Sequence, residues 1–149
     1  MHKKRIYGPK GPFYHTAIFR EIMKSLLLAT FIVLLSSGAF ATEATDLRAK
    51  GVQAASNGNF IEAQKYLSQS AKLGYYTAQV EYAYLLESSP DNVQNRPESY
   101  AWFNVVVARK GTDTEFAKEG LSRLSKAMSS SETQKAKELT KKYLEQYAK

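Results

Sequence analysis

Apolar residues recur at the spacing of an α-helix along most of the chain after residue 44. One helical face, with members at i, i+4, i+7 and i+11, consists of Ala117, Leu121, Leu124 and Met128. The pattern predicts an all-α protein of about six helices, over residues 45–56, 60–73, 76–88, 97–110, 113–127 and 130–147. Six helices make three hairpins, roughly the minimum for a stable stack of hairpins, so the sequence predicts one structured domain.

Several predicted helices begin with a recognisable capping pattern. A capping box places a residue with a short polar side chain three positions before a glutamate, and each side chain then satisfies a free backbone N–H of the first turn. The candidate pairs are Asn59 with Glu62, Thr112 with Glu115, and Ser129 with Glu132. Pro97 suits the first turn of the fourth helix, because the N–H that proline lacks would have no helical partner there.

Two copies of one phrase of small, aromatic and glycine residues follow each other along the chain. The first copy consists of Ala63, Tyr66, Ser70, Ala71, Gly74 and Ala78, and a shift of 37 residues carries three of these positions onto Phe103, Ala108 and Gly111. Stacked helical hairpins need small residues where helices touch and a glycine where a helix ends, so this period predicts a hairpin array.

The two copies resemble the Sel1-like repeat, a relative of the tetratricopeptide repeat, over about residues 47–128. The resemblance implies a short right-handed array of antiparallel helical hairpins, an α-solenoid, that binds a partner instead of catalysing a reaction. It also implies that the first helix of each hairpin lines a concave surface. The residues expected on that surface are Thr77, Val80, Tyr84, Glu87, Glu119, Arg123 and Lys126.

Tyr84 is the candidate binding anchor of this stripe, since exposed tyrosines are common at the centre of binding surfaces. The alternative is that the chain itself fills the groove and buries the ring. Tyr66, Tyr82 and Tyr100 stand at repeat positions that favour a packing role, because aromatic side chains dominate core burial.

Residues 23–41 have the pattern of a secretory signal peptide. Lys24 precedes the apolar run 26–35, and Ala39-Phe40-Ala41 has the small-x-small form of a cleavage site. The expected product is exported to the periplasm or the medium, is cleaved after Ala41 and contains residues 42–149. The run is short for a membrane span of about 20 residues, so an uncleaved anchor is the alternative. Residues 1–22 are interpreted as upstream sequence before a start at Met23, or as an extended basic leader.

Charge and composition exclude several function classes for the expected product. The whole chain has a net charge of +7, but residues 1–41 hold six of the 21 Lys and Arg and only one of the 14 acids. Nucleic-acid binding therefore loses its support, because it needs a concentrated basic stripe. Both histidines, His2 and His15, lie in the removed segment, and the chain has no cysteine. We expect no catalytic residue, no cofactor and no metal, since the usual nucleophile, base and zinc or copper ligands are missing.

Carboxylates remain as candidate catalytic groups, but no pair of acids stands in an apolar setting. The lysines of the last helix, Lys135, Lys137, Lys141 and Lys142, are expected to form the solvated outer face of a terminal repeat, with an anionic partner as the alternative.

The sequence therefore predicts a non-catalytic, exported helical-repeat protein that binds or scaffolds a protein or peptide in the bacterial cell envelope. An enzyme or accessory factor acting on cell-wall material is one alternative, and a signal-anchored membrane scaffold is another. No stable membrane span is expected after cleavage. The oligomeric state is left open.

Overall fold

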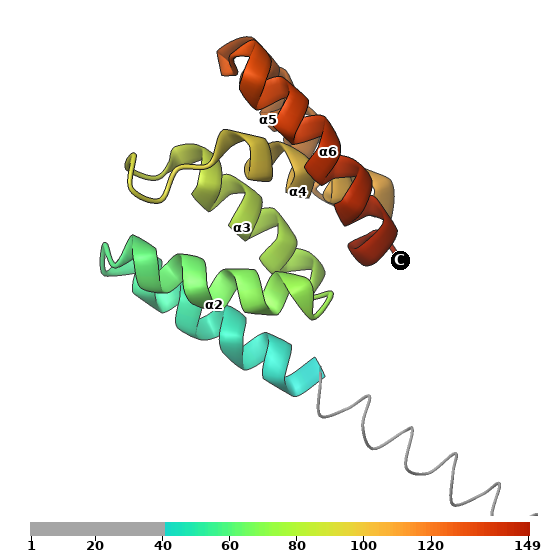
Figure 1. Ribbon diagram of the computed structural model, residues 1–149. Helices are drawn as coiled ribbons and strands as arrows, with labels where there is room; N and C mark the ends of the chain where they lie inside the picture. The colour runs from blue at the N-terminus through green and yellow to red at the C-terminus, as the bar shows by residue number, and fades with distance from the viewer. Residues whose placement is uncertain (1–40) are drawn as a thin grey trace, which may run out of the picture. The chain divides into compact units, whose positions relative to one another are not determined.

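The computed structural model of the chain describes residues 41–149, and this part is all-α (Figure 1). A first helix covers residues 41–56. It is followed by α2 (Phe60–Lys72), α3 (Tyr76–Ser88), α4 (Arg96–Arg109), α5 (Thr114–Ala127) and α6 (Ser130–Tyr147). The predicted all-α class with about six helices is confirmed, and the bounds of α2 to α6 lie within one residue of the predicted ones. The arrangement of the helices as a right-handed α-solenoid stays a prediction. The predicted leader lies outside the described residues, apart from Ala41.

Small residues allow α2, α3 and α4 to approach closely. Ala63, Ala71, Ala78, Ala83 and Ala101 are fully buried between these helices. Polar side chains cross the same contacts. The Ser99 hydroxyl donates to the Ala83 carbonyl at 2.7 Å, and the Gln79 amide donates to the Ala71 carbonyl at 3.2 Å. α3 is therefore a central helix that is buried on most of its sides.

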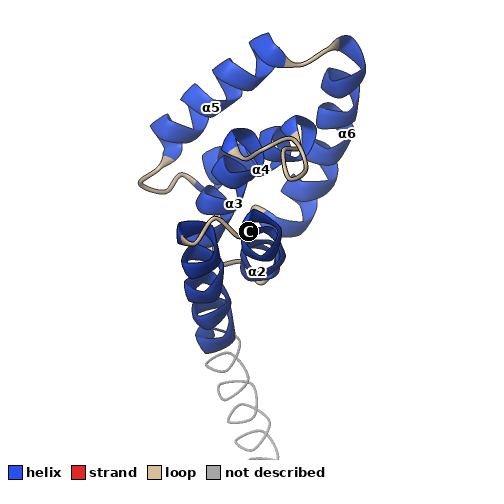
Figure 2. Ribbon diagram, turned by 90° about the vertical axis from the view of Figure 1, so that its left-hand side faces the viewer, coloured by secondary structure: helices blue, strands red, loops and turns tan. Residues whose placement is uncertain are grey.

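The last two helices do not pack as a simple hairpin. α6 packs chiefly on α4, and α5 packs on another side of α4 and touches α3. Figure 2 shows α5 and α6 on either side of α4, joined by a short connection. The α4–α6 contact contains the fully buried Trp102, which lies 4.9 Å from Tyr143 and from Tyr147 between ring centroids. The aromatic cluster explains why α6 prefers α4 to its neighbour in sequence.

Only one of the three predicted capping boxes forms. Ser129 accepts a hydrogen bond from the Glu132 N–H, and the Glu132 carboxylate accepts one from the Ser129 N–H. Asn59 precedes α2 without a side-chain cap, and α5 starts after Asp113, so Thr112 is not its N-cap. Asn95 caps α4 through the Glu98 N–H, with Pro97 in the first turn as predicted.

The residues of the two repeat copies differ in burial and in backbone conformation. Ala63, Ala71, Ala78 and Phe103 are fully buried, whereas Ala108 is exposed, so its prediction as a packing position is wrong. Tyr66 is half-buried, with the Lys65 ammonium 5.5 Å from its ring centroid. Gly74 has a φ of 88° and follows α2, as a helix-ending glycine should. In the second copy, the left-handed residue at the end of α4 is Lys110, with a φ of 54°, and not Gly111.

Candidate functional site

Three exposed hydrophobic side chains come from the first helix, α3 and α5. They are Val52, Tyr84 and Phe116, with exposed fractions of 36%, 50% and 37%. The rings of Tyr84 and Phe116 are in contact, with centroids 5.8 Å apart. Phe116 in turn meets the fully buried Phe103 of α4 with a centroid distance of 5.9 Å. The exposed aromatic pair is therefore held in place by a ring of the core.

Two ion pairs bridge the same three helices. The Arg48 guanidinium of the first helix donates from Nε to Glu81 Oε2 of α3 at 2.8 Å, and a second nitrogen donates to Oε1. The Arg123 guanidinium of α5 donates to both carboxylate oxygens of Glu87 at 2.8 and 2.9 Å. The hydrogen bonds to Glu81 and Glu87 raise the pKa of Arg48 and of Arg123 respectively.

We call this region the Tyr84 surface and define it by Arg48, Val52, Glu81, Tyr84, Glu87, Phe116 and Arg123. Each glutamate of the surface is matched by an arginine. The region around the aromatic pair therefore carries polar groups at its edges without a net charge. Such a combination of an aromatic centre and paired charges is typical of surfaces that hold a protein segment.

A pocket of about 290 Å³ opens beside Tyr84 between the first helix, α2 and α3. Its walls are largely apolar, and its lining residues are Val52, Ala55, Ser56, Phe60, Leu67, Glu81, Tyr84, Leu85, Ser88 and Ser89. Val52, Glu81 and Tyr84 belong both to this pocket and to the Tyr84 surface. The pocket and the surface are therefore parts of one continuous site.

The residues predicted for the concave stripe divide into two groups in the structure. Val80 has an exposed fraction of 8%, so it belongs to the core and is not available for binding. Thr77, Tyr84, Glu119, Arg123 and Lys126 are exposed, and Glu87 is half-buried. Of the predicted residues, the structure brings Tyr84, Glu87 and Arg123 together on one surface. Whether the stripe binds a partner stays a prediction.

The sequence reasoning missed Phe116, Val52, and the Arg48–Glu81 pair. Phe116 lies outside the apolar series that starts at Ala117, and this departure was a readable signal, because an apolar side chain away from the buried face of a helix is exposed. The Arg48–Glu81 pair joins residues 33 positions apart, and helical spacing says nothing about such a contact.

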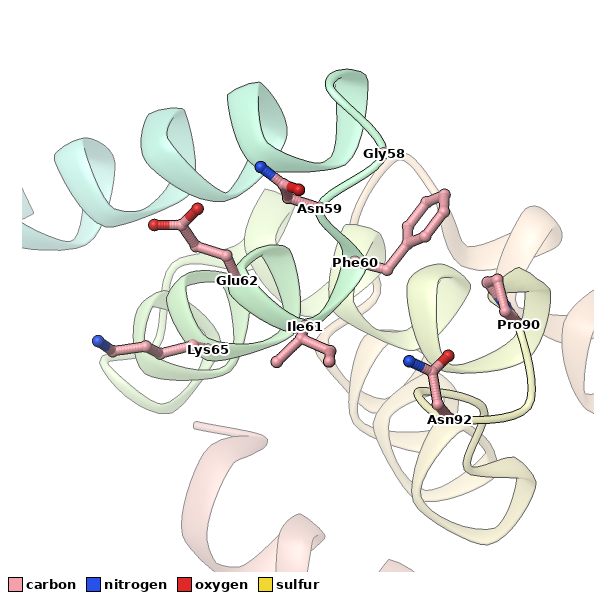
Figure 3. A pocket seen from close by; sticks show the side chains of 8 residues that line it. All are labelled: Gly58, Asn59, Phe60, Ile61, Glu62, Lys65, Pro90 and Asn92. Atoms are coloured by element: carbon pink, nitrogen blue, oxygen red, sulfur yellow. The ribbon is translucent and has the colours of Figure 1, made fainter.

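A larger opening of about 750 Å³ lies between the loop before α2 and the loop after α3 (Figure 3). Its lining includes Ile61, whose exposed fraction of 66% is the highest among the large hydrophobic residues of residues 41–149. Figure 3 shows Phe60 directed toward Pro90, whereas Glu62 and Lys65 point to the opposite side. The polar groups do not converge on one point, which makes this opening a weaker candidate.

Residues 41–149 contain no group of three or more carboxylate, histidine or cysteine side chains that could hold a metal ion. Within the same residues, no helix has both the length and the apolar character needed to cross a membrane.

The two tyrosines with strongly raised pKa values, Tyr82 and Tyr143, are buried or half-buried beside Glu98, and burial is the main cause of the raised pKa in both. Both hydroxyls donate to Glu98 Oε1 of α4, at 3.2 and 3.1 Å, and the bond from Tyr143 joins α6 to α4.

Comparisons with known proteins assign no family to the chain. No protein-family model, no curated protein and no solved structure matches it significantly. The Sel1-like resemblance therefore stays a prediction from the two repeat copies, and any functional argument depends on the chemistry of the Tyr84 surface.

Proposed function

We propose that residues 42–149 form a non-catalytic binding module of the cell envelope, which holds a segment of a protein or peptide on the Tyr84 surface. The observation that carries the proposal is the contact between Tyr84 and Phe116, two half-exposed rings supported from below by the buried Phe103. Burying such rings against a partner releases water from apolar surface and costs little side-chain entropy, since their neighbours already restrain them.

The paired charges indicate which kind of segment fits the Tyr84 surface. A partner that covers Tyr84 meets the Glu81 and Glu87 carboxylates already bound by Arg48 and Arg123. It therefore needs no compensating positive charge, and a strongly charged segment gains nothing there. An apolar or aromatic segment with uncharged polar groups fits this surface best.

Export is the second part of the proposal, and it is supported by the apolar run 26–35 and Ala39-Phe40-Ala41. The Sel1-like resemblance supports a scaffold role in the periplasm or outside the cell. Intact-mass analysis of the protein recovered from the periplasm or the medium tests this part. The expected mass is that of residues 42–149, and a mass that includes residues 1–22 would contradict both the cleavage site and the start at Met23.

A capture experiment with three forms of the protein tests the binding part. The full chain, Tyr84→Ala and Ile61→Ala are used as baits on an envelope extract of the source cells. Both substitutions remove an exposed hydrophobic side chain, but only Tyr84 belongs to the Tyr84 surface. We expect the captured partner to be lost with Tyr84→Ala and retained with Ile61→Ala. The reverse result would place the site at the larger opening near Ile61, and capture that survives both changes would contradict the proposal.

A further inference from the structure

The connection between α5 and α6 differs from the other helix connections of residues 41–149. It consists of Met128 and Ser129, whose ψ angles of 139° and 168° are extended. Each of the other four connections contains a glycine or a proline, namely Gly58, Gly74, Pro90 and Gly111. Glycine and proline are the residues that end helices most strongly, whereas methionine and serine also occur inside helices. The residues of this connection therefore do not enforce the break between α5 and α6.

The side chains that hold α6 have their partners on α4. The Glu132 carboxylate lies 3.8 Å from the Arg96 guanidinium, and the Tyr143 hydroxyl donates to Glu98 at 3.1 Å. The ring of Tyr143 also lies 4.9 Å from that of Trp102 between centroids. α5 has no comparable contact with α6, although the two helices are joined directly (Figure 2). The place of α6 is therefore set by the surface of α4 and not by the helix that precedes it.

The capping box of Ser129 and Glu132 stabilises the bent form of the connection. In a helix that continued through Met128 and Ser129, the first N–H groups of α6 would bond the last carbonyls of α5 instead of side chains. One set of hydrogen bonds would replace the other, so the bent and the straight connection are close in free energy. Because α5 and α6 lie on either side of α4, a straight connection would carry α6 away from the α4 of its own chain.

We propose that two copies of the chain form a dimer by exchanging α6, with α5 and α6 joined into one helix and each α6 bound to the α4 of the other copy. The surface that receives the second copy is the α4 face of Arg96, Glu98 and Trp102. Its occupant is the helix that covers this face in the single chain, so every contact between α4 and α6 is kept. The inference goes beyond the proposed function and does not depend on it.

The chemistry of the α4 face explains why a second copy is the partner. Trp102 is fully buried under α6, and an uncovered face would expose its ring to water. Glu98 accepts a hydrogen bond from the Tyr143 hydroxyl and needs a donor in the same place. The α6 helix of another copy supplies this hydroxyl together with the rings of Tyr143 and Tyr147, at the spacing that the face already fits.

The exchange would give the dimer two binding surfaces. α5 keeps its place on α4, so Phe116 and Arg123 stay beside Tyr84 in each copy. A partner with two suitable segments would then gain from the second contact without any new interaction, because that contact forms within one complex. Exchange of α6 thus offers a route from a single binding module to a bivalent one.

The first test measures the mass of the protein in solution by size-exclusion chromatography with light scattering. A short tether gives a segment an effective concentration of about 1 mM, so the unmodified protein should be monomeric at about 10 µM and partly dimeric at about 1 mM. Ser129→Ala removes a cap that only the bent form uses. Each cap favours that form about fivefold, and two are given up in a dimer, so the association constant should rise about 25-fold.

Two changes of the connection length extend this test. Deleting Met128 and Ser129 should give a dimer even at about 10 µM, because α6 can no longer fold back onto its own α4. Inserting Gly-Ser-Gly-Ser between the same two residues should keep the protein monomeric at about 1 mM, because a flexible connection lets α6 return and cannot continue the helix.

Three results would overturn the inference at this stage. The first is a Ser129→Ala protein that is still monomeric at about 1 mM. The second is association that is equally strong in all four forms, since a contact through another surface, such as the apolar run 26–35, does not depend on the connection. The third is a dimer that becomes more stable when Gly-Ser-Gly-Ser is inserted.

The second test identifies the helix that is exchanged. Isotope-labelled and unlabelled protein are unfolded together, refolded at high concentration, and the dimer fraction is isolated. NOEs filtered for pairs of atoms on different chains should join Trp102 of one copy to Tyr143 and Tyr147 of the other, because these rings are in contact. A dimer without these NOEs is held by another surface and would overturn the inference, whatever the variants of the connection do to the mass.

Discussion

The ring of Tyr76 lies directly against Gly111, so that a β-carbon at position 111 would be only 2.2 Å from Tyr76 Cζ. The ring is fixed there by two contacts. Its hydroxyl accepts a hydrogen bond from the Asp113 N–H at 3.1 Å, and the Arg109 guanidinium lies 5.5 Å from its centroid. Gly111 thus provides space for the ring at the connection between α4 and α5.

Gly74, the matching glycine of the first copy, has the opposite property. Its φ of 88° favours glycine, but a β-carbon there would meet nothing within 4 Å. A side chain would therefore find space at position 74, and only the backbone conformation there favours glycine. One glycine of the repeat is required for its backbone conformation and the other for its small size.

This difference predicts different responses to two substitutions. Alanine should destabilise the domain by about 1 kcal/mol at position 74, through its left-handed backbone. At position 111 it should cost about 1 to 3 kcal/mol, because the Tyr76 ring must move. Asparagine, which tolerates the left-handed region, should cost less than alanine at 74 and more than alanine at 111. Urea unfolding of the four variants measures this, and the same order of asparagine and alanine at both positions would contradict it.

The capping boxes allow a second matched comparison. Ser129→Ala removes a cap that accepts the Glu132 N–H, and we expect a loss of about 1 kcal/mol in the free energy of unfolding. Thr112→Ala removes a hydroxyl that bonds only the Asp113 side chain, and its effect should stay within about 0.5 kcal/mol. Equal losses in the two variants would show that the capping geometry does not distinguish them.

The pH dependence of the same cap has a definite sign. Hydrogen bonds from the Ser129 backbone and side chain lower the pKa of Glu132 below its usual value of about 4.3. The contribution of Glu132 is therefore present above that pH and is lost as the pH falls through the lowered pKa. The difference in the free energy of unfolding between the unmodified chain and Ser129→Ala should become smaller as the pH is lowered. A difference that grows on acidification would contradict the capping box of Ser129 and Glu132.

Local signals explain why the helix bounds were predictable from the sequence. The apolar spacing and Pro97 act within one or two turns, so they place α4 without any knowledge of its neighbours. The capping pattern was less reliable, because it identifies candidate residues and not their backbone angles. Asn59 has a ψ of 66° and its side chain makes no cap, whereas Ser129 is extended and caps α6.

Contacts between distant helices could not be predicted in the same way. Helical spacing groups Val80 with Tyr84 on one stripe of α3, but α3 is enclosed by several neighbours, and of these two residues only Tyr84 is exposed. The Tyr84 surface depends on which helices flank α3, and Phe116 and Arg48 enter it from elements far away in the sequence. The packing of α6 on α4 and not on α5 likewise depends on the contacts of Trp102 with Tyr143 and Tyr147, which are far from it in the sequence.

Because of the two tyrosines that donate hydrogen bonds to Glu98, we expect the protein to lose stability at alkaline pH. Burial raises the pKa of Tyr82 and of Tyr143, and the negative charge of Glu98 raises both further. A tyrosine with a raised pKa stabilises the fold fully below the ordinary value of about 10, and the contribution is lost as the pH rises through the raised pKa. The melting temperature should therefore fall above about pH 10, and less steeply in Tyr143→Phe. An identical alkaline profile for Tyr143→Phe would contradict the role of Tyr143.

Trp102 is the single tryptophan of the chain, so its fluorescence reports directly on the docking of α6 against α4. The ring is fully buried and is stacked on Tyr147, with an angle of 27° between the ring planes. Tyr147→Ala removes this stacked ring near the end of α6. We expect a loss of about 1 to 2 kcal/mol in the free energy of unfolding, from the apolar area and the aromatic contact together.

The emission of Trp102 should shift to longer wavelength in Tyr147→Ala, because water reaches the indole, and an added quencher should become more effective. Tyr66→Ala is the matched control, since Tyr66 is a half-buried tyrosine on α2, a helix that does not contact α6 closely. The emission of Trp102 should be unchanged in folded Tyr66→Ala, whatever the effect of this substitution on stability. If Tyr147→Ala leaves the emission of Trp102 unchanged as well, α6 does not depend on the aromatic cluster for its place on α4, and another contact must hold the last helix.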